Sequence, residues 1–154
     1  MLATLERKSR QNLAEICLPD FCRQWTINRR ILMSNKPYGT FIGSVTFSPL
    51  NDETQRYLES GTLHVPTTSS LAANRIYVWD RNLRIFFEDG CFFHQILTDG
   101  EEIRYECGSD RYRGRYNFDA WPIWEVTWSV TGPRKNYQLS SLYRPRTAYD
   151  RLKH

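Results

Sequence analysis

Between residues 24 and 144 most segments alternate large apolar side chains with polar ones, which is the two-residue period of a pleated β-strand. The alternation is clearest from Trp124 to Arg144, where it stops once, at Gly132-Pro-Arg-Lys135, and then resumes. Glycine and proline end strands and form tight turns. This stretch therefore predicts two long antiparallel strands that are joined by a tight corner.

The same pattern of strands and turns runs through the rest of the chain. Asp89-Gly90 and Asp99-Gly100 are strong hairpin signals. Within the strand expected over 103–118, the alternation changes phase at Gly108-Ser109, which predicts a β-bulge. The expected strands cover about 24–34, 38–47, 54–65, 73–80, 83–88, 91–97 and 103–118, and the pair on either side of the corner brings the count to about nine.

These elements predict an all-β fold, a single up-and-down antiparallel β-barrel of about eight to ten strands. A barrel also removes the exposed sheet edges that aromatic strands would otherwise present. Residues 1–17 have the spacing of an amphipathic helix, which Leu18-Pro19 ends. We expect residues 1–154 to form one domain, with a helix and cap over 1–20, the barrel over 24–144 and a tail over 145–154.

Composition excludes some classes of protein. No run of about 18 apolar residues is present, so no membrane span is expected, and the first residues lack a secretory signal, which favours the cytoplasm. The net charge is +4, but the basic residues are scattered. Arg111, Arg113 and Arg115 share one strand face that is interpreted as a solvated surface rather than a phosphate-binding stripe, so nucleic acid is not the expected partner.

The cysteines do not indicate a metal site. Cys17 and Cys22 are too widely spaced for a zinc knuckle, and no second ligand pair follows them. In a cytoplasmic chain of this size disulfides are not expected either. The four cysteines are interpreted as buried free thiols, and no cofactor is predicted.

At low resolution the chain resembles a calycin, the barrel type of lipocalins and fatty-acid-binding proteins. A helix precedes a first strand that carries Trp25, and the last strand ends in Arg144. In lipocalins such a Trp stacks on such an Arg and closes the barrel. The chain departs from that pattern at Arg23, where lipocalins carry Gly.

The closer similarity is to the uncharacterised lipocalin-like family DUF6314, which implies a fold but no known activity. The segments that carry this similarity are Trp25 with Arg29, Gly39–Phe47, Tyr57–Gly61, Arg75–Trp79, Phe87–Gly90 with Phe93-His94, Cys107 with Asp110–Tyr112, Trp128–Lys135 and Tyr143-Arg144. The Gly132-Pro-Arg-Lys135 corner is the most specific of these segments. Tyr105 stands where the family pattern has a His.

Charged residues lie on the strand faces that carry the large apolar side chains. These are Arg29, Glu59, Arg75 and Asp110, and several tyrosines join them. Buried charges must be paired, because desolvation costs several kcal/mol per ion. They could form a neutral network that fixes the strand register. They could equally line a polar cavity in which an Arg fork and Tyr hydroxyls hold a carboxylate or phosphate.

We therefore predict a binding protein for a small polar or anionic ligand. The candidate ligand-binding residues of the barrel interior are Arg29, Tyr57, Glu59, Arg75, Tyr77, Trp79, Asp110, Tyr112, Trp128 and Tyr143. The candidate structural residues are Trp25, Gly132, Pro133, Lys135 and Arg144. A monomer and a homodimer both fit the sequence.

Two alternatives remain open at this point. A cofactor-free enzyme, such as an isomerase, hydratase or hydrolase, could use Glu59 or Asp110 with a raised pKa as its acid or base. An interaction module could have its barrel filled by aromatic side chains. His64 is expected to point outward, whereas the environment of His94 is ambiguous.

Overall fold

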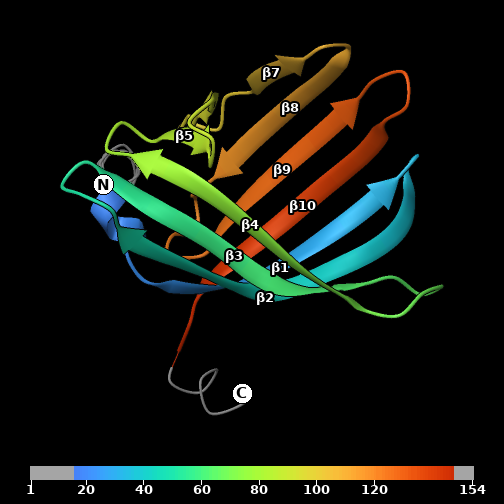
Figure 1. Cartoon of the computed structure of the whole chain (residues 1–154), viewed down its shortest axis with the longest axis horizontal. Helices are drawn as coiled ribbons and strands as arrows, with labels where there is room; N and C mark the ends of the chain where they lie inside the picture. The colour runs from blue at the N-terminus through green and yellow to red at the C-terminus, as the bar shows by residue number, and fades with distance from the viewer. Residues whose placement is uncertain (1–15, 148–154) are drawn as a thin grey trace, which may run out of the picture.

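The computed structural model describes residues 16–147, which form one antiparallel sheet of ten strands curled into a nearly closed barrel (Figure 1). A short 3-10 helix, η1 (Leu18–Phe21), precedes the strands. The strands are β1 (Gln24–Met33), β2 (Lys36–Pro49), β3 (Thr54–His64), β4 (Leu71–Asp80), β5 (Arg84–Phe87), β6 (Phe92–Gln95), β7 (Ile103–Cys107), β8 (Asp110–Asn117), β9 (Trp124–Thr131) and β10 (Asn136–Pro145). The predicted all-β antiparallel barrel is confirmed.

Consecutive strands pair with each other except β6 and β7, and the first and last strands, β1 and β10, pair with each other as well. β6 and β7 lie at the two ends of the strand order. Aromatic rings span the seam between them, because the ring centroids of Phe93 and Tyr105 are 5.1 Å apart. Most of the predicted N-terminal helix and of the predicted tail lies outside the described residues. Within the described residues, no helix has the length and apolar character needed to cross a membrane.

The predicted single strand over 103–118 is wrong. β7 and β8 form a hairpin in which Cys107 pairs with Asp110 around the Gly108-Ser109 turn. Gly108 has a φ of +60°, a left-handed conformation that glycine adopts without steric cost. A phase change in the alternation has the same signature whether the chain bulges or reverses, so the sequence pattern did not separate the two.

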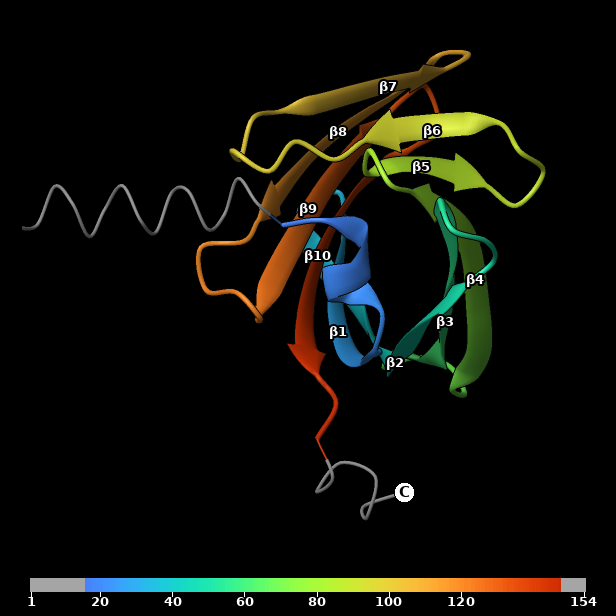
Figure 2. The same cartoon turned by 90° about the vertical axis from the view of Figure 1, so that its left-hand side faces the viewer.

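One end of the barrel is filled by aromatic side chains, and Figure 2 looks onto η1 at this end. Phe21 of η1 is fully buried and packs against Trp124 and Trp79, with centroid distances of 5.4 Å and 5.1 Å. The indole Nε1 of Trp25 donates a hydrogen bond to the Phe21 carbonyl oxygen at 3.1 Å. These rings form an aromatic plug at this end of the barrel.

The predicted Trp25–Arg144 stack is wrong. The guanidinium over the Trp25 ring belongs to Arg23, 5.2 Å from the ring centroid, whereas the Arg144 side chain is exposed. Arg144 lies opposite Thr26 in the ladder between β1 and β10, one position out of step with Trp25. Its side chain therefore points to the outside of the barrel, and Arg23 covers the indole instead.

All four cysteines are free, as predicted, but their side chains are exposed rather than buried. Cys91 follows the turn between β5 and β6, and Cys107 ends β7, so both lie at strand ends where the barrel wall no longer covers them. The prediction of buried thiols is therefore wrong.

A glycine pair lets β2 and β3 approach closely. Gly43 lies opposite Gly61, and a Cβ on Gly43 would meet the Ser60 carbonyl oxygen and lie 2.7 Å from Gly61 Cα. We expect Gly43→Ala to lower the free energy of unfolding by about 1–3 kcal/mol through overpacking. Urea unfolding would measure this, with Ser44→Ala on the opposite face of β2 as the control. Equal stability of the two variants would contradict the steric explanation.

Candidate functional site

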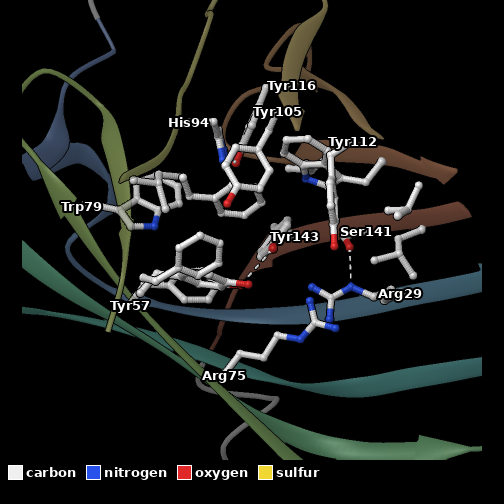
Figure 3. A pocket seen from close by; sticks show the side chains of 18 of the residues that line it. Arg29, Tyr57, Arg75, Trp79, His94, Tyr105, Tyr112, Tyr116, Ser141 and Tyr143 are labelled. Atoms are coloured by element: carbon white, nitrogen blue, oxygen red, sulfur yellow. Dashed lines mark hydrogen bonds between the residues drawn. The ribbon is translucent and has the colours of Figure 1, made fainter. Parts of the chain in front are cut away.

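The barrel encloses a cavity of about 270 Å³ beyond the aromatic plug. Its deep end is lined by buried side chains such as Tyr57, Trp79 and Trp124, and its mouth by exposed or half-buried ones such as Arg75 and Tyr137. Figure 3 shows Tyr57, Trp79 and Arg75 around the cavity. The interior is thus not packed solid, which removes the basis for the filled-barrel alternative. Most of the lining is aromatic.

A buried ion pair lies in the wall of the cavity. Arg29 holds Glu59 through two hydrogen bonds of 2.8 Å each, from Nη1 and Nη2 to the two carboxylate oxygens. Arg29 Nε donates a third hydrogen bond, also 2.8 Å long, to Ser141 Oγ. Arg29 is 7% exposed and Glu59 1% exposed. This arrangement is the bidentate geometry in which Arg binds a carboxylate most strongly.

The ion pair sets the protonation of both partners. Burial alone would raise the pKa of Glu59, but the hydrogen bonds and charge of Arg29 outweigh it and hold that pKa below its usual value. Burial likewise opposes the charge on Arg29, and the Glu59 carboxylate more than compensates, so the pKa of Arg29 is raised. Both groups therefore stay ionised at neutral pH.

Two tyrosine hydroxyls extend this network. Tyr57 donates to Glu59 Oε1 at 2.6 Å, and its oxygen lies 2.9 Å from the Tyr143 hydroxyl. Because the Tyr57 proton is directed to Glu59, Tyr143 must donate to Tyr57, which leaves the Tyr143 oxygen free to accept. Burial raises the pKa of Tyr143 to about 12, so this hydroxyl stays protonated.

Neither predicted carboxylate lines the cavity. Glu59 is covered by its partners, and Asp110 lies outside, where its Oδ2 accepts from Lys135 Nζ at 2.9 Å. The Gly132 N–H donates to the Lys135 carbonyl at 2.8 Å in the predicted corner, and a Cβ on Gly132 would collide with Asp110 Oδ1. Asp110 therefore secures the Gly132–Lys135 corner, and its placement among the interior ligand-binding residues is wrong.

The acid–base alternative rested on a raised carboxylate pKa. For Glu59 that prediction is wrong, since its pKa is lowered and its two oxygens already accept three hydrogen bonds. Asp110 does not reach the cavity. Within residues 16–147, the side chains that line the cavity include no Asp or Glu.

Arg75 differs from Arg29 although both face inward. Its side chain is 49% exposed at the mouth, and its Nε lies 4.0 Å from Glu59 Oε2, which Arg29 already occupies. Within the described residues its guanidinium donates no hydrogen bond. The cavity mouth therefore carries a positively charged group whose hydrogen-bonding capacity is unused.

His94 is a cavity residue that the sequence left ambiguous. It is 4% exposed, and its Nε2 lies 2.8 Å from the Tyr116 hydroxyl. Burial lowers the pKa of His94 to about 3, so the ring is neutral. Its Nδ1 is buried and has no partner among the described residues. His64, in contrast, is exposed as predicted, with its Nδ1 3.0 Å from Ser70 Oγ.

Most of the other predicted interior residues do line the cavity, namely Tyr77, Trp79, Tyr112 and Trp128. The set of predicted site residues omitted several lining aromatics, among them Phe93, Tyr105, Tyr116 and Trp124. The strict alternation of β8 and β9 contained the signal for Tyr116 and Trp124. The short strands β6 and β7 did not carry enough alternation to assign Phe93 and Tyr105.

The arginine stripe of β8 lies on the outer surface. Arg111, Arg113 and Arg115 are all exposed, and Arg115 Nη1 donates to the Gly100 carbonyl at 2.9 Å. Arg104 lies opposite Arg113 on β7 and pairs with Glu102 at 3.1 Å. The stripe is therefore a solvated face that does not contribute to the cavity.

Comparison with known proteins gives a family and a fold. The model of a family described as "Family of unknown function (DUF6314)" matches residues 21–145. No curated protein matches the chain. Among solved structures, the chain is similar to the S-type phycobiliprotein lyase CPES from Guillardia theta, with 8% sequence identity, a TM-score of 0.62 and coverage of 90% of this chain and 97% of that one. This likeness shows the fold alone, a calycin-like barrel.

Proposed function

We propose that this chain, which belongs to the DUF6314 family, binds a small organic ligand with a carboxylate or phosphate group in its barrel interior. The observation that carries the proposal is the juxtaposition of a cavity of about 270 Å³ with an Arg75 guanidinium that donates no hydrogen bond within residues 16–147. Small-molecule sites are concave and mostly apolar, and they contain a few polar groups that point towards the ligand. The cavity has these properties.

The two inward arginines have different roles in this proposal. Arg29 directs three N–H groups at Glu59 and Ser141, so it maintains the hydrogen-bond network in the cavity wall. Arg75 has its planar fork of donors available, which is the group that pairs with a carboxylate or phosphate. The recognition of the acidic group therefore falls to Arg75.

Binding is favoured over catalysis by the state of the titratable groups. A general acid or base works best with a pKa near the working pH. Glu59 is held ionised by Arg29, and burial moves the pKa of His94 to about 3. Neither group is poised to exchange a proton with a bound molecule at neutral pH.

Native mass spectrometry of the protein as purified from cells tests this proposal. The expected spectrum contains a reproducible additional mass that disappears after mild denaturation. A bare-chain mass, together with no retention of any member of a panel of aromatic and aliphatic carboxylates, would contradict the proposed function.

Arg75→Met should reduce occupancy by an acidic ligand about tenfold or more, because a hydrogen bond to a charged group contributes about 1.5–3 kcal/mol. Arg113→Met is the matched control, since it removes the same charge from the outer face of β8. Affinities would be measured by isothermal titration with the acid identified in the mass spectrum. Equal losses in the two variants would indicate a general charge effect and no role for Arg75 as a ligand.

A further inference from the structure

The cavity has two ends of different chemistry. At the mouth, Arg75 and Cys107 are exposed, and Tyr137 is half-buried. At the deep end, Trp79, Trp124 and Tyr143 are each no more than 5% exposed. The exposed fraction thus falls steeply from the guanidinium at the mouth to the aromatic plug.

The deep end carries no unpaired charge within the described residues. The Arg29 charge is neutralised by the two hydrogen bonds to Glu59, and His94 is held against the Tyr116 hydroxyl. An anionic group placed there would lose its hydration without gaining a free cation, which costs several kcal/mol. At the mouth, the same group would stay partly hydrated and meet Arg75.

The deep end is also built from flat surfaces. The rings of Trp124 and Tyr143 stack 3.7 Å apart at an interplanar angle of 2°, and those of Tyr57 and Trp79 are parallel within 4°. Aromatic faces pack favourably against other flat rings. The volume of about 270 Å³ equals about nine water molecules at their share in the liquid. That volume suits a body of a few rings.

We propose that the ligand is an amphiphilic monoacid. It has a flat, uncharged aromatic or conjugated body in the deep end and a single acidic group at the mouth, held by Arg75. This inference rests on the proposed function and goes beyond it by fixing the number of charges, the shape and the orientation of the ligand. It excludes molecules with acidic groups at both ends.

Two fluorescent probes distinguish the contribution of the aromatic body to binding from that of the acidic group. 8-Anilino-1-naphthalenesulfonate and N-phenyl-1-naphthylamine share the same aromatic body, and only the first carries an anionic group. Fluorescence titration of the wild type should show that both probes bind, with the sulfonate about tenfold tighter, because its acid pairs with Arg75. Arg75→Met should remove this tenfold advantage and leave the affinity of the neutral probe unchanged.

Two further measurements locate the probes. Leu139 is half-buried and lines the cavity, so Leu139→Trp should fill the space and weaken both probes. Cys107 lines the cavity, whereas Cys91 is exposed outside it. A bound probe should therefore slow alkylation of Cys107 by iodoacetamide and leave Cys91 unaffected, as followed by mass spectrometry of the peptides.

The outcomes distinguish this inference from the proposed function. Equal affinities of the two probes in the wild type, or equal weakening of both by Arg75→Met, would overturn the single-acid orientation while cavity binding still held. The proposed function itself would be overturned if neither probe bound. It would also be overturned if Leu139→Trp did not weaken probe binding and a bound probe did not slow the alkylation of Cys107.

Discussion

Glu59→Gln should lower the free energy of unfolding by about 3–5 kcal/mol, because it leaves the Arg29 guanidinium buried without its counter-charge. Glu59 is 1% exposed and accepts two hydrogen bonds from Arg29 and one from Tyr57. A neutral amide cannot accept the bidentate pair with both of its groups, since its NH₂ is a donor. Urea unfolding followed by tryptophan fluorescence would measure the loss.

The matched control is Glu53→Gln. Glu53 pairs with Arg81 at 3.5 Å, but its side chain is 68% exposed, and exposed ion pairs contribute only about 0–1 kcal/mol.

The double variant Arg29→Met/Glu59→Met should recover much of the lost stability, because an apolar pair leaves no uncompensated charge. If Glu59→Gln lowers the free energy of unfolding only slightly, or if the double variant recovers none of the loss, the Arg29–Glu59 pair does not have the proposed stabilising role.

The strands were predictable because a barrel wall buries one face of each strand. Alternation alone therefore assigned Arg29, Tyr57, Arg75 and Tyr143 to the inner face, where the structure places them. The partner of Arg29 was not predictable in the same way. Glu59 is thirty residues away in the chain and two strands away in the sheet, so the contact depends on the register of β2 as well as on the close approach at Gly43.

The errors at Asp110 and His94 have local physical causes. Asp110 shares a strand face with Tyr112, as the alternation predicts, but it is the first residue of β8, beside the hairpin turn, where it pairs with Lys135 and does not line the cavity. His94 lies in β6, a strand of four residues, which is too short for a period of two to establish a face. The cavity itself depends on how far the aromatic plug extends, and that is a property of packing which composition does not reveal.

The stability of the protein should fall as the pH is lowered from about 6.5, and His94 is the cause. Its pKa is about 3 in the folded protein, whereas an exposed histidine titrates near 6.5. Between these values the unfolded chain binds a proton that the folded chain excludes, so the stabilisation is complete above pH 6.5 and is lost as the pH falls towards 3. At about 1.4 kcal/mol per pH unit, the loss should reach about 2 kcal/mol at pH 5.

Urea unfolding at pH 7 and at pH 5 measures this slope. His94→Gln should abolish most of it, because His94 is the only buried histidine within residues 16–147, even if the variant is less stable at both pH values. His64→Gln should retain the slope, since His64 is exposed. Below the usual pKa of Glu59, near 4.5, loss of the Arg29–Glu59 pair should add a second decline, because that pKa is lowered in the folded protein. An unchanged slope between pH 7 and pH 5 in His94→Gln would refute the assignment of the acid sensitivity to this buried, neutral ring.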